Sequence, residues 1–236
     1  MQARRAMTTR DGGHSAAPFD AFNLSGGVGD DPAAVTANRE MLAGALGLAP
    51  NGVLWMHQVH GTGVTVVEGP ADADIADTDA LVTNRPGHAL AVLAADCVPV
   101  LLADEQAGVI GAVHAGREGA VAGVLPAAIK AMTDLGARPE AMEVLLGPAI
   151  CGGCYEVGGY VQAEVQEALP GSACRTRAGT PGVDLHQGLT GQLRALGVTS
   201  VAIDPRCTYE DPDLYSHRRD QPTGRFAAVT WLDDSA

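Results

Sequence analysis

Long apolar runs are missing from this sequence. No stretch of the 236 residues approaches the roughly 20 consecutive apolar residues that a membrane-spanning helix needs. The N-terminus carries Arg4 and Arg5, but polar and small residues follow where a signal peptide has its apolar segment. We therefore expect a cytoplasmic protein with no membrane partner.

Positive charge is also scarce. Lys and Arg number 15 against 28 Asp and Glu, which gives a formal net charge of −13. A protein that binds nucleic acid needs a basic surface to neutralise phosphates, so we expect no nucleic-acid partner. A small anion is still compatible with this charge, because a few arginines can focus a local positive field.

Cysteine and histidine are present in numbers that exclude two further classes. Five cysteines, an odd number, do not form a disulfide framework in a chain of this length, and we expect reduced thiols. The seven histidines include no H-x-H pair. A multicopper laccase centre draws largely on such pairs, so the sequence does not predict one.

The order of apolar segments predicts an α/β fold, with mixed β-sheets flanked by helices in a single domain over 1–236. Asp31 and Pro32 predict an N-capped helix that ends near Leu46. The apolar runs at 89–102 and 109–114 predict buried strands. We also expect strand, turn and strand over 54–67, helices at 116–135, 161–168 and 187–196, and strands at 142–146, 200–204 and 225–231. Residues 1–7 and 233–236 are expected to be flexible tails.

Three polar residues stand where the chain otherwise favours apolar residues or tight turns: His60, Cys97 and His114. Imidazole and thiolate together suit zinc, and three protein ligands leave a fourth position open for chemistry. The three come from separate elements, however, so their spacing alone leaves open that they are ordinary core residues.

Other cysteines and the C-terminal loop region give weaker patterns. Cys151 and Cys154 form a C-x-x-C without a second pair, which favours a turn carrying two thiols, and Cys174 and Cys207 are interpreted as inert. No His is followed two residues later by Glu, so the zinc deaminase signature is absent.

The polar segment 204–225 is either a solvated loop or a pocket wall. In the second case Tyr209 or Tyr215 stacks a base, and Arg218 or Arg219 binds an anion. Arg117, at the expected start of a helix, is a third candidate for an anion.

Several short motifs of this chain occur in the same order in one protein family. The match covers nearly the whole chain, from about Thr8 to Leu232. The motifs are Thr8-Thr9-Arg10-Asp11-Gly12-Gly13, Gln58-Val59-His60-Gly61, Ala95-Asp96-Cys97-Val98-Pro99, Val113-His114-Ala115-Gly116, Gly147-Pro148-Ala149-Ile150, Cys154-Tyr155-Glu156-Val157, Cys207-Thr208-Tyr209, Tyr215-Ser216-His217-Arg218-Arg219 and Thr223-Gly224-Arg225. With these motifs the chain resembles the YfiH-type family, also called the laccase-domain or polyphenol-oxidase family.

The resemblance implies a YfiH-like fold and a zinc site formed by His60, Cys97 and His114, with copper as an adventitious substitute. It implies a purine nucleoside enzyme that phosphorolyses adenosine, inosine and S-methyl-5′-thioadenosine to base and ribose 1-phosphate, with adenosine deaminase activity. Purine nucleosides and phosphate are then the partners. With it we expect Asp96 and Gln58 to be catalytic. We expect substrate contacts from Asn23, Arg117, Tyr155, His217, Arg218 and Arg219.

Three alternatives stay open at this point. One is an amidase that edits a peptidoglycan precursor, another is the polyphenol oxidase activity of the family name, and the third is a non-catalytic metal-binding module. The chain also departs from the family in having Arg117-Glu118 after His-Ala-Gly, where many members have Trp-Arg, and in separating Cys151 from Cys154 by two glycines.

Overall fold

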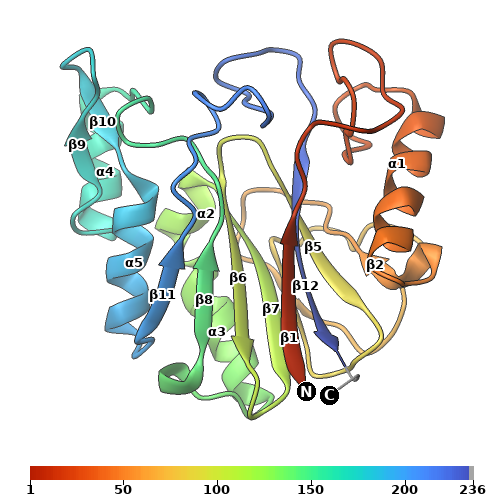
Figure 1. The fold of residues 1–236 in the computed structure, drawn as a ribbon. Coiled ribbons are helices and arrows are strands. Elements are labelled where there is room, and N and C mark those ends of the chain that lie inside the picture. Colours follow the sequence, from red (N-terminus) through yellow and green to blue (C-terminus); the bar gives the residue numbers. More distant parts are fainter. Residues whose placement is uncertain (234–236) are drawn as a thin grey trace.

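Two β-sheets packed face to face form the centre of the molecule (Figure 1). The computed structural model describes residues 1–233. The larger sheet has the order β11-β8-β6-β7-β4-β3, and the smaller has the order β1-β12-β5-β2. The strands of the larger sheet are β3 (Val64–Val66), β4 (Ala80–Thr83), β6 (Val98–Asp104), β7 (Val109–Ala115), β8 (Glu143–Leu146) and β11 (Ser200–Ile203). Those of the smaller sheet are β1 (Gln2–Met7), β2 (Val53–Leu54), β5 (Ala89–Ala94) and β12 (Phe226–Asp233).

Helices cover the outer faces of both sheets. Helix α1 (Pro32–Ala45) packs on the smaller sheet, and its N-cap Asp31 accepts a hydrogen bond from the backbone of Ala33, as the sequence predicts. On the larger sheet lie α2 (Arg117–Ala122), α3 (Val124–Asp134), α4 (Gly159–Ala168) and α5 (Leu185–Ala195). Strands β9 (Ala173–Arg175) and β10 (Pro181–Val183) form a separate pair, and η1 (Pro50–Gly52) and η2 (Pro139–Ala141) are short 3₁₀ turns.

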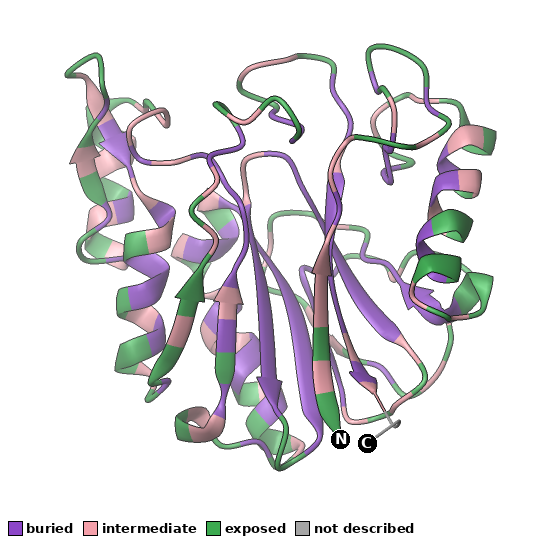
Figure 2. Cartoon of the chain, in the orientation of Figure 1, coloured by how far each residue is buried: buried purple, intermediate pink, exposed green. Residues whose placement is uncertain are grey.

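Strand β5 shows why the central segments are almost continuously apolar. Leu90 and Val92 enter the core between the two sheets, whereas Ala91 and Leu93 face α1. Both faces of the strand are therefore buried, and alternation with polar residues disappears (Figure 2). The run predicted at 89–102 divides into β5 and β6, which belong to different sheets.

The expected flexible tail at 1–7 is wrong. Residues Gln2–Met7 form β1, which pairs antiparallel with β12 through six registered positions from Gln2 opposite Asp233 to Met7 opposite Ala228. Because β1 is stabilised by pairing with β12, more than 200 residues away in the sequence, no local sequence pattern predicts it. Residues 234–236, expected to be a tail, lie outside the described residues.

Two further expectations change in detail. The single helix predicted over 116–135 is two helices, because Gly123 adopts a left-handed backbone (φ 96°) between α2 and α3. The two strands expected over 54–67 are present as β2 and β3, but they lie in different sheets and do not pair with each other. Within residues 1–233 no helix is both long and apolar enough to cross a membrane.

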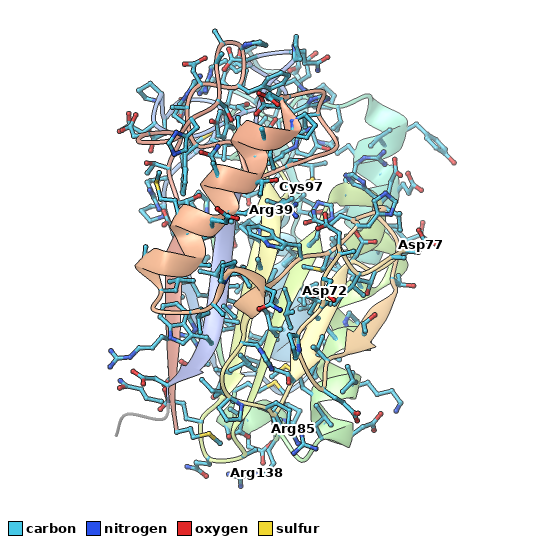
Figure 3. All side chains as sticks on the ribbon, turned by 90° about the vertical axis from the view of Figure 1, so that its right-hand side faces the viewer. Arg39, Asp72, Asp77, Arg85, Cys97 and Arg138 are labelled. Carbon is cyan, nitrogen blue, oxygen red and sulfur yellow. The ribbon has the colours of Figure 1, made fainter. Side chains whose placement is uncertain are left out.

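Chain direction brings several loops to one end of the sandwich. Strand β5 ends and β6 begins there, and because β7 runs antiparallel to β6, β7 also ends there. Strand β4 is antiparallel to β7 and therefore starts at the same end. Cys97, in the β5–β6 connection, lies at this end, away from Arg85 and Arg138 at the other (Figure 3).

Candidate metal centre and adjoining pocket

His60, Cys97 and His114 meet at this end of the sheets. Their potential ligand atoms all lie within 4.8 Å of one another. The Cys97 Sγ atom is 3.8 Å from His60 Nε2, and the two imidazole rings stand edge to face with centroids 4.7 Å apart. A tetrahedral ion with bonds of about 2.1 and 2.3 Å places its nitrogen and sulfur ligands roughly 3.6 Å apart, so the spacing fits a shared metal ion.

Each of the three residues is placed by a different local device. His114 is the penultimate residue of β7 and is 2% exposed. Cys97 lies in the short link from β5 to β6, which turns through Asp96 at a φ of 93°. His60 also has a positive φ, 60°, in the loop before β3. Non-glycine residues rarely adopt this conformation, and their concentration here marks a constrained site.

Asp79 holds the two histidines in place, and sequence reasoning missed it. Its Oδ1 atom lies 2.8 Å from His114 Nδ1 and accepts the backbone N–H of His60 at 3.0 Å. Its Oδ2 atom accepts the backbone N–H groups of Val59 and Gly61. A carboxylate on Nδ1 leaves Nε2 of His114 as the metal-binding nitrogen. The available hint was an acidic residue directly before the apolar segment that forms β4.

Charge coupling favours the deprotonated thiol. Burial by itself raises the pKa of Cys97, but the charge and hydrogen bonds of His114, together with His60, outweigh it and lower the pKa to about 6. Burial by itself lowers the pKa of His114, whereas the Cys97 thiolate and Asp79 raise it to about 9. Burial likewise opposes ionisation of Asp79, yet hydrogen bonds from His114 and Gly61 leave its pKa below the ordinary value. The site thus prepares a thiolate, which is the form that binds a metal.

Gly116 provides the space in which the three side chains meet. A Cβ atom added there would lie 2.7 Å from His60 Cδ2, 3.1 Å from Cys97 Sγ and 3.4 Å from His114 Cε1. The residue has an ordinary φ of −70°, so the glycine is required by packing and not by backbone conformation. The space beside Gly116 and the imidazole and thiolate donors around it together fit a metal ion.

A pocket of about 130 Å³ opens beside Cys97. Arg218 lies over the ring of Tyr155, with its guanidinium carbon 5.1 Å from the ring centroid. The pocket therefore combines an aromatic face, cationic groups and the thiol of the metal centre. Its lining residues are Ala95, Asp96, Cys97, Arg117, Ile150, Tyr155, Leu185, His217 and Arg218.

The side chains of the two residues expected to be catalytic, Asp96 and Gln58, both form hydrogen bonds within the protein. Asp96 lines the pocket, but its Oδ1 atom accepts the hydroxyl of Thr208 at 2.6 Å and its Oδ2 atom accepts the backbone N–H of Arg218 at 2.6 Å. Gln58 donates to the carbonyl of Leu93 and accepts from its N–H, which ties the His60 loop to β5. Asp96 thus connects the metal centre to the C-terminal loop, and Gln58 connects the His60 loop to β5.

Two of the expected substrate contacts do not face the pocket. Asn23 is fully buried, and its side-chain amide forms hydrogen bonds with Ser25, Asp30 and the backbone of Arg225. The Arg219 guanidinium pairs with Asp220 and donates to main-chain carbonyls of the C-terminal loop. Most of its N–H donors are therefore used within the loop, which makes Arg219 a less favourable anion ligand than Arg218.

Neither of the two tyrosines that were expected to stack a base lines the pocket. Tyr215 is fully buried and donates its hydroxyl to the carbonyl of Phe19 at 2.7 Å, so its ring is not open to a ligand. Tyr209 is exposed and lines two hollows beside Cys154, one of which also includes Arg218, but it does not line this pocket. Tyr155, in the C-Y-E motif, is the aromatic residue that the pocket presents.

Arg225 is a second residue that sequence reasoning missed. It lines a hollow of about 200 Å³ on another side of the metal centre, with His57, His60 and His114. Burial lowers the pKa of Arg225, while Cys97 and Asp96 oppose this shift. It belongs to the motif Thr223-Gly224-Arg225, but its position directly before the last strand predicted no role for it.

Comparisons with known proteins agree on the family. A family model described as multi-copper polyphenol oxidoreductase laccase matches residues 4–233. The chain is 57% identical over 233 residues to a purine nucleoside phosphorylase of Mycobacterium tuberculosis, covering 99% of this chain and 93% of that protein. A purine nucleoside phosphorylase of Streptomyces griseus is also 57% identical, covering 98% and 95%. The hypothetical protein YfiH of Bacillus licheniformis matches with a TM-score of 0.92 at 28% identity, covering 98% and 93%, which confirms the predicted YfiH-like fold.

Proposed function

This chain belongs to the family described as multi-copper polyphenol oxidoreductase laccase, and we propose that it is a zinc-dependent purine nucleoside phosphorylase. The proposed substrates are adenosine, inosine and S-methyl-5′-thioadenosine with inorganic phosphate. Two relatives at 57% identity carry the name purine nucleoside phosphorylase, which supports this choice within the family. We propose adenosine deamination as a parallel activity.

The pocket beside Cys97 is the observation that carries the proposal. Tyr155 places an aromatic ring in the pocket wall for a purine to contact, and Arg218, which lies over one face of this ring, also donates to the carbonyl of Glu156. Arginine provides planar, bidentate donors suited to phosphate oxygens. The aromatic and cationic groups are thus adjacent, as a nucleoside and a phosphate in one site require.

Of the three candidate arginines, Arg218 is the one that we assign to phosphate. Arg117 pairs with Glu118 at 2.7 Å and approaches Glu164 at 3.9 Å, which offsets its charge. The Arg219 guanidinium donates most of its hydrogen bonds to main-chain carbonyl oxygens of its own loop. Within residues 1–233 no carboxylate forms an ion pair with the Arg218 guanidinium, so its charge is available to an anion.

In phosphorolysis a phosphate oxygen bonds to C1′ of the ribose while the glycosidic C–N bond breaks, and the purine leaves with the electron pair and takes up a proton. Arg218 would hold the phosphate, and Tyr155 would orient the purine. Asp96 would act through Arg218, whose backbone N–H it anchors. His60, Cys97 and His114 would hold the zinc ion, which supplies the acidified water that deamination requires.

Polyphenol oxidation by a multicopper centre is less well supported. Of the seven histidines, only His60 and His114 belong to a group that could hold a metal ion within residues 1–233. The remaining alternatives, amide hydrolysis and a non-catalytic module, are separated from phosphorolysis by the products that form.

The test is the phosphate dependence of base release in arginine variants. Arg218→Ala is expected to raise the KM for phosphate by tenfold or more, equivalent to about 1.4 kcal/mol, with zinc content unchanged. Arg138→Ala is the matched control, since this arginine lies at the opposite end of the molecule (Figure 3). An Arg218→Ala enzyme with an unaltered phosphate requirement would remove the assignment. Free base without ribose 1-phosphate would favour hydrolysis instead.

A further inference from the structure

A second group of thiols lies outside the centre described above. Cys151 and Cys154 are in the turn that follows β8, and Cys207 follows β11. An isolated parallel bridge between Ala149 and Cys207 brings these segments together. The sulfur atoms and a carboxylate oxygen of Glu210 all lie within 4.8 Å of one another.

The turn at 151–154 is shaped to present its thiols on one side. The backbone N–H groups of Cys154 and Tyr155 both donate to the carbonyl of Cys151 at 2.9 Å. A Cβ atom at Gly152 would lie 2.8 Å from the sulfur of Cys174 and 2.9 Å from Cβ of Asp184, so the turn requires glycine there. The backbone N–H of Cys151 donates to the Cys207 sulfur at 3.3 Å, as amides do around metal-bound thiolates.

A positive side chain also stands at this group. The Arg177 guanidinium donates to the Cys154 sulfur at 3.3 Å and forms an ion pair with Glu210. Three thiolates and a carboxylate around a divalent cation leave a net charge of −2, and an adjacent guanidinium offsets part of it. The arrangement therefore contains both the ligands of a soft metal ion and a counter-charge.

We propose that Cys151, Cys154, Cys207 and Glu210 bind a second Zn²⁺ ion, separate from the centre at His60, Cys97 and His114. Zinc bonds of about 2.3 Å to sulfur and 2.1 Å to oxygen place tetrahedral ligand atoms roughly 3.6 to 3.8 Å apart. The four groups, which lie within 4.8 Å of one another, therefore need to approach by about 1.2 Å at most. Four protein ligands make a closed site, which is the arrangement of structural zinc. The proposal does not depend on the reaction that the protein catalyses.

This ion would brace the two walls of the pocket. Cys151 directly follows Ile150 and Cys154 directly precedes Tyr155, and both of these neighbours line the pocket. Cys207 directly precedes Thr208, whose hydroxyl holds Asp96. Zinc at the cluster would therefore fix the Tyr155 wall against the C-terminal loop.

Metal content in a Cys97→Ser background tests the proposal. Wild-type protein purified from zinc-containing medium is expected to hold two zinc ions per chain, measured by inductively coupled plasma mass spectrometry. The Cys97→Ser protein is expected to hold one. Adding Cys154→Ser should remove the remaining ion. Adding Cys174→Ser should leave it, since this cysteine has similar partial burial but lies outside the four-residue group. Cobalt added to metal-free Cys97→Ser protein should give a thiolate charge-transfer band that Cys154→Ser abolishes.

A second measurement needs no variant. In wild-type protein, zinc should slow alkylation of Cys151, Cys154 and Cys207 at least tenfold relative to chelator-treated protein, with Cys174 unaffected. A Cys97→Ser protein that binds neither zinc nor cobalt would overturn the proposal. So would equal alkylation of the three cysteines with and without zinc, or a disulfide between any two of them in freshly isolated protein.

Discussion

At the residue scale, the metal centre depends on the missing side chain at Gly116. Gly116→Ala is expected to lower metal affinity at the centre at least tenfold, because the new methyl group would occupy the space between His60, Cys97 and His114. The fold should persist, since the backbone at Gly116 suits any residue. Competition between the protein and a chromogenic chelator measures the affinity.

The matched control for this prediction is Gly158→Ala. Gly158 is also a helix N-cap, with φ −66° and ψ 150°, and a Cβ atom there meets nothing within 4 Å. An equal loss of metal in both variants, or none in either, would show that Gly116 does not shape the site.

A second prediction at this scale concerns pH. In metal-free protein the pKa of Cys97 is about 6 against an ordinary value of 9.0, so the thiolate forms as the pH rises through 6. The alkylation rate of Cys97 should therefore rise with a midpoint near pH 6, followed by mass spectrometry of its peptide. His114→Ala should move the midpoint upward, because it removes the main charge that stabilises the thiolate. A midpoint near 9 in the unaltered protein would contradict the electrostatic account.

At the element scale, Gly123 divides the predicted single helix into α2 and α3. Its left-handed backbone costs an L-residue about 1–2 kcal/mol, so Gly123→Ala should lower the free energy of unfolding by that amount. Gly44→Ala, inside α1 with open space around its Cβ position, should raise it by up to about 1 kcal/mol. Denaturant titration of both variants measures the difference. Equal effects of the same sign would show that the break at Gly123 is not conformationally required.

Elements with strong local patterns could be predicted from the sequence, whereas those fixed by distant partners could not. Helix α1 has a capping aspartate, a proline in its first turn and an apolar face, all of them local. Strand β1 is specified by its pairing with β12 across the length of the chain. The strand of four residues that forms β4 is too short to be recognised, although it places Asp79.

At the scale of the whole molecule, the donors of the metal centre could be predicted and their surroundings could not. His60, Cys97 and His114 stand out because they interrupt apolar or glycine-rich segments. Asn23, Arg219 and Tyr215 have equally suitable chemistry, but packing turns them inward or saturates their hydrogen bonds. Which polar residue faces a pocket depends on how loops from 8–31, 95–97 and 204–225 meet at one end of the sheets (Figure 1).

Phosphorolysis in the pocket beside the metal centre is the proposed activity on which the role of Arg218 depends. The measurement that tests it most directly is the product balance for inosine with zinc-loaded protein, in phosphate buffer and in a phosphate-free buffer of equal ionic strength. The account predicts that free base appears only with phosphate and in equal amount to ribose 1-phosphate. Base released at the same rate without phosphate, or no base at all from fully zinc-loaded protein, would contradict it.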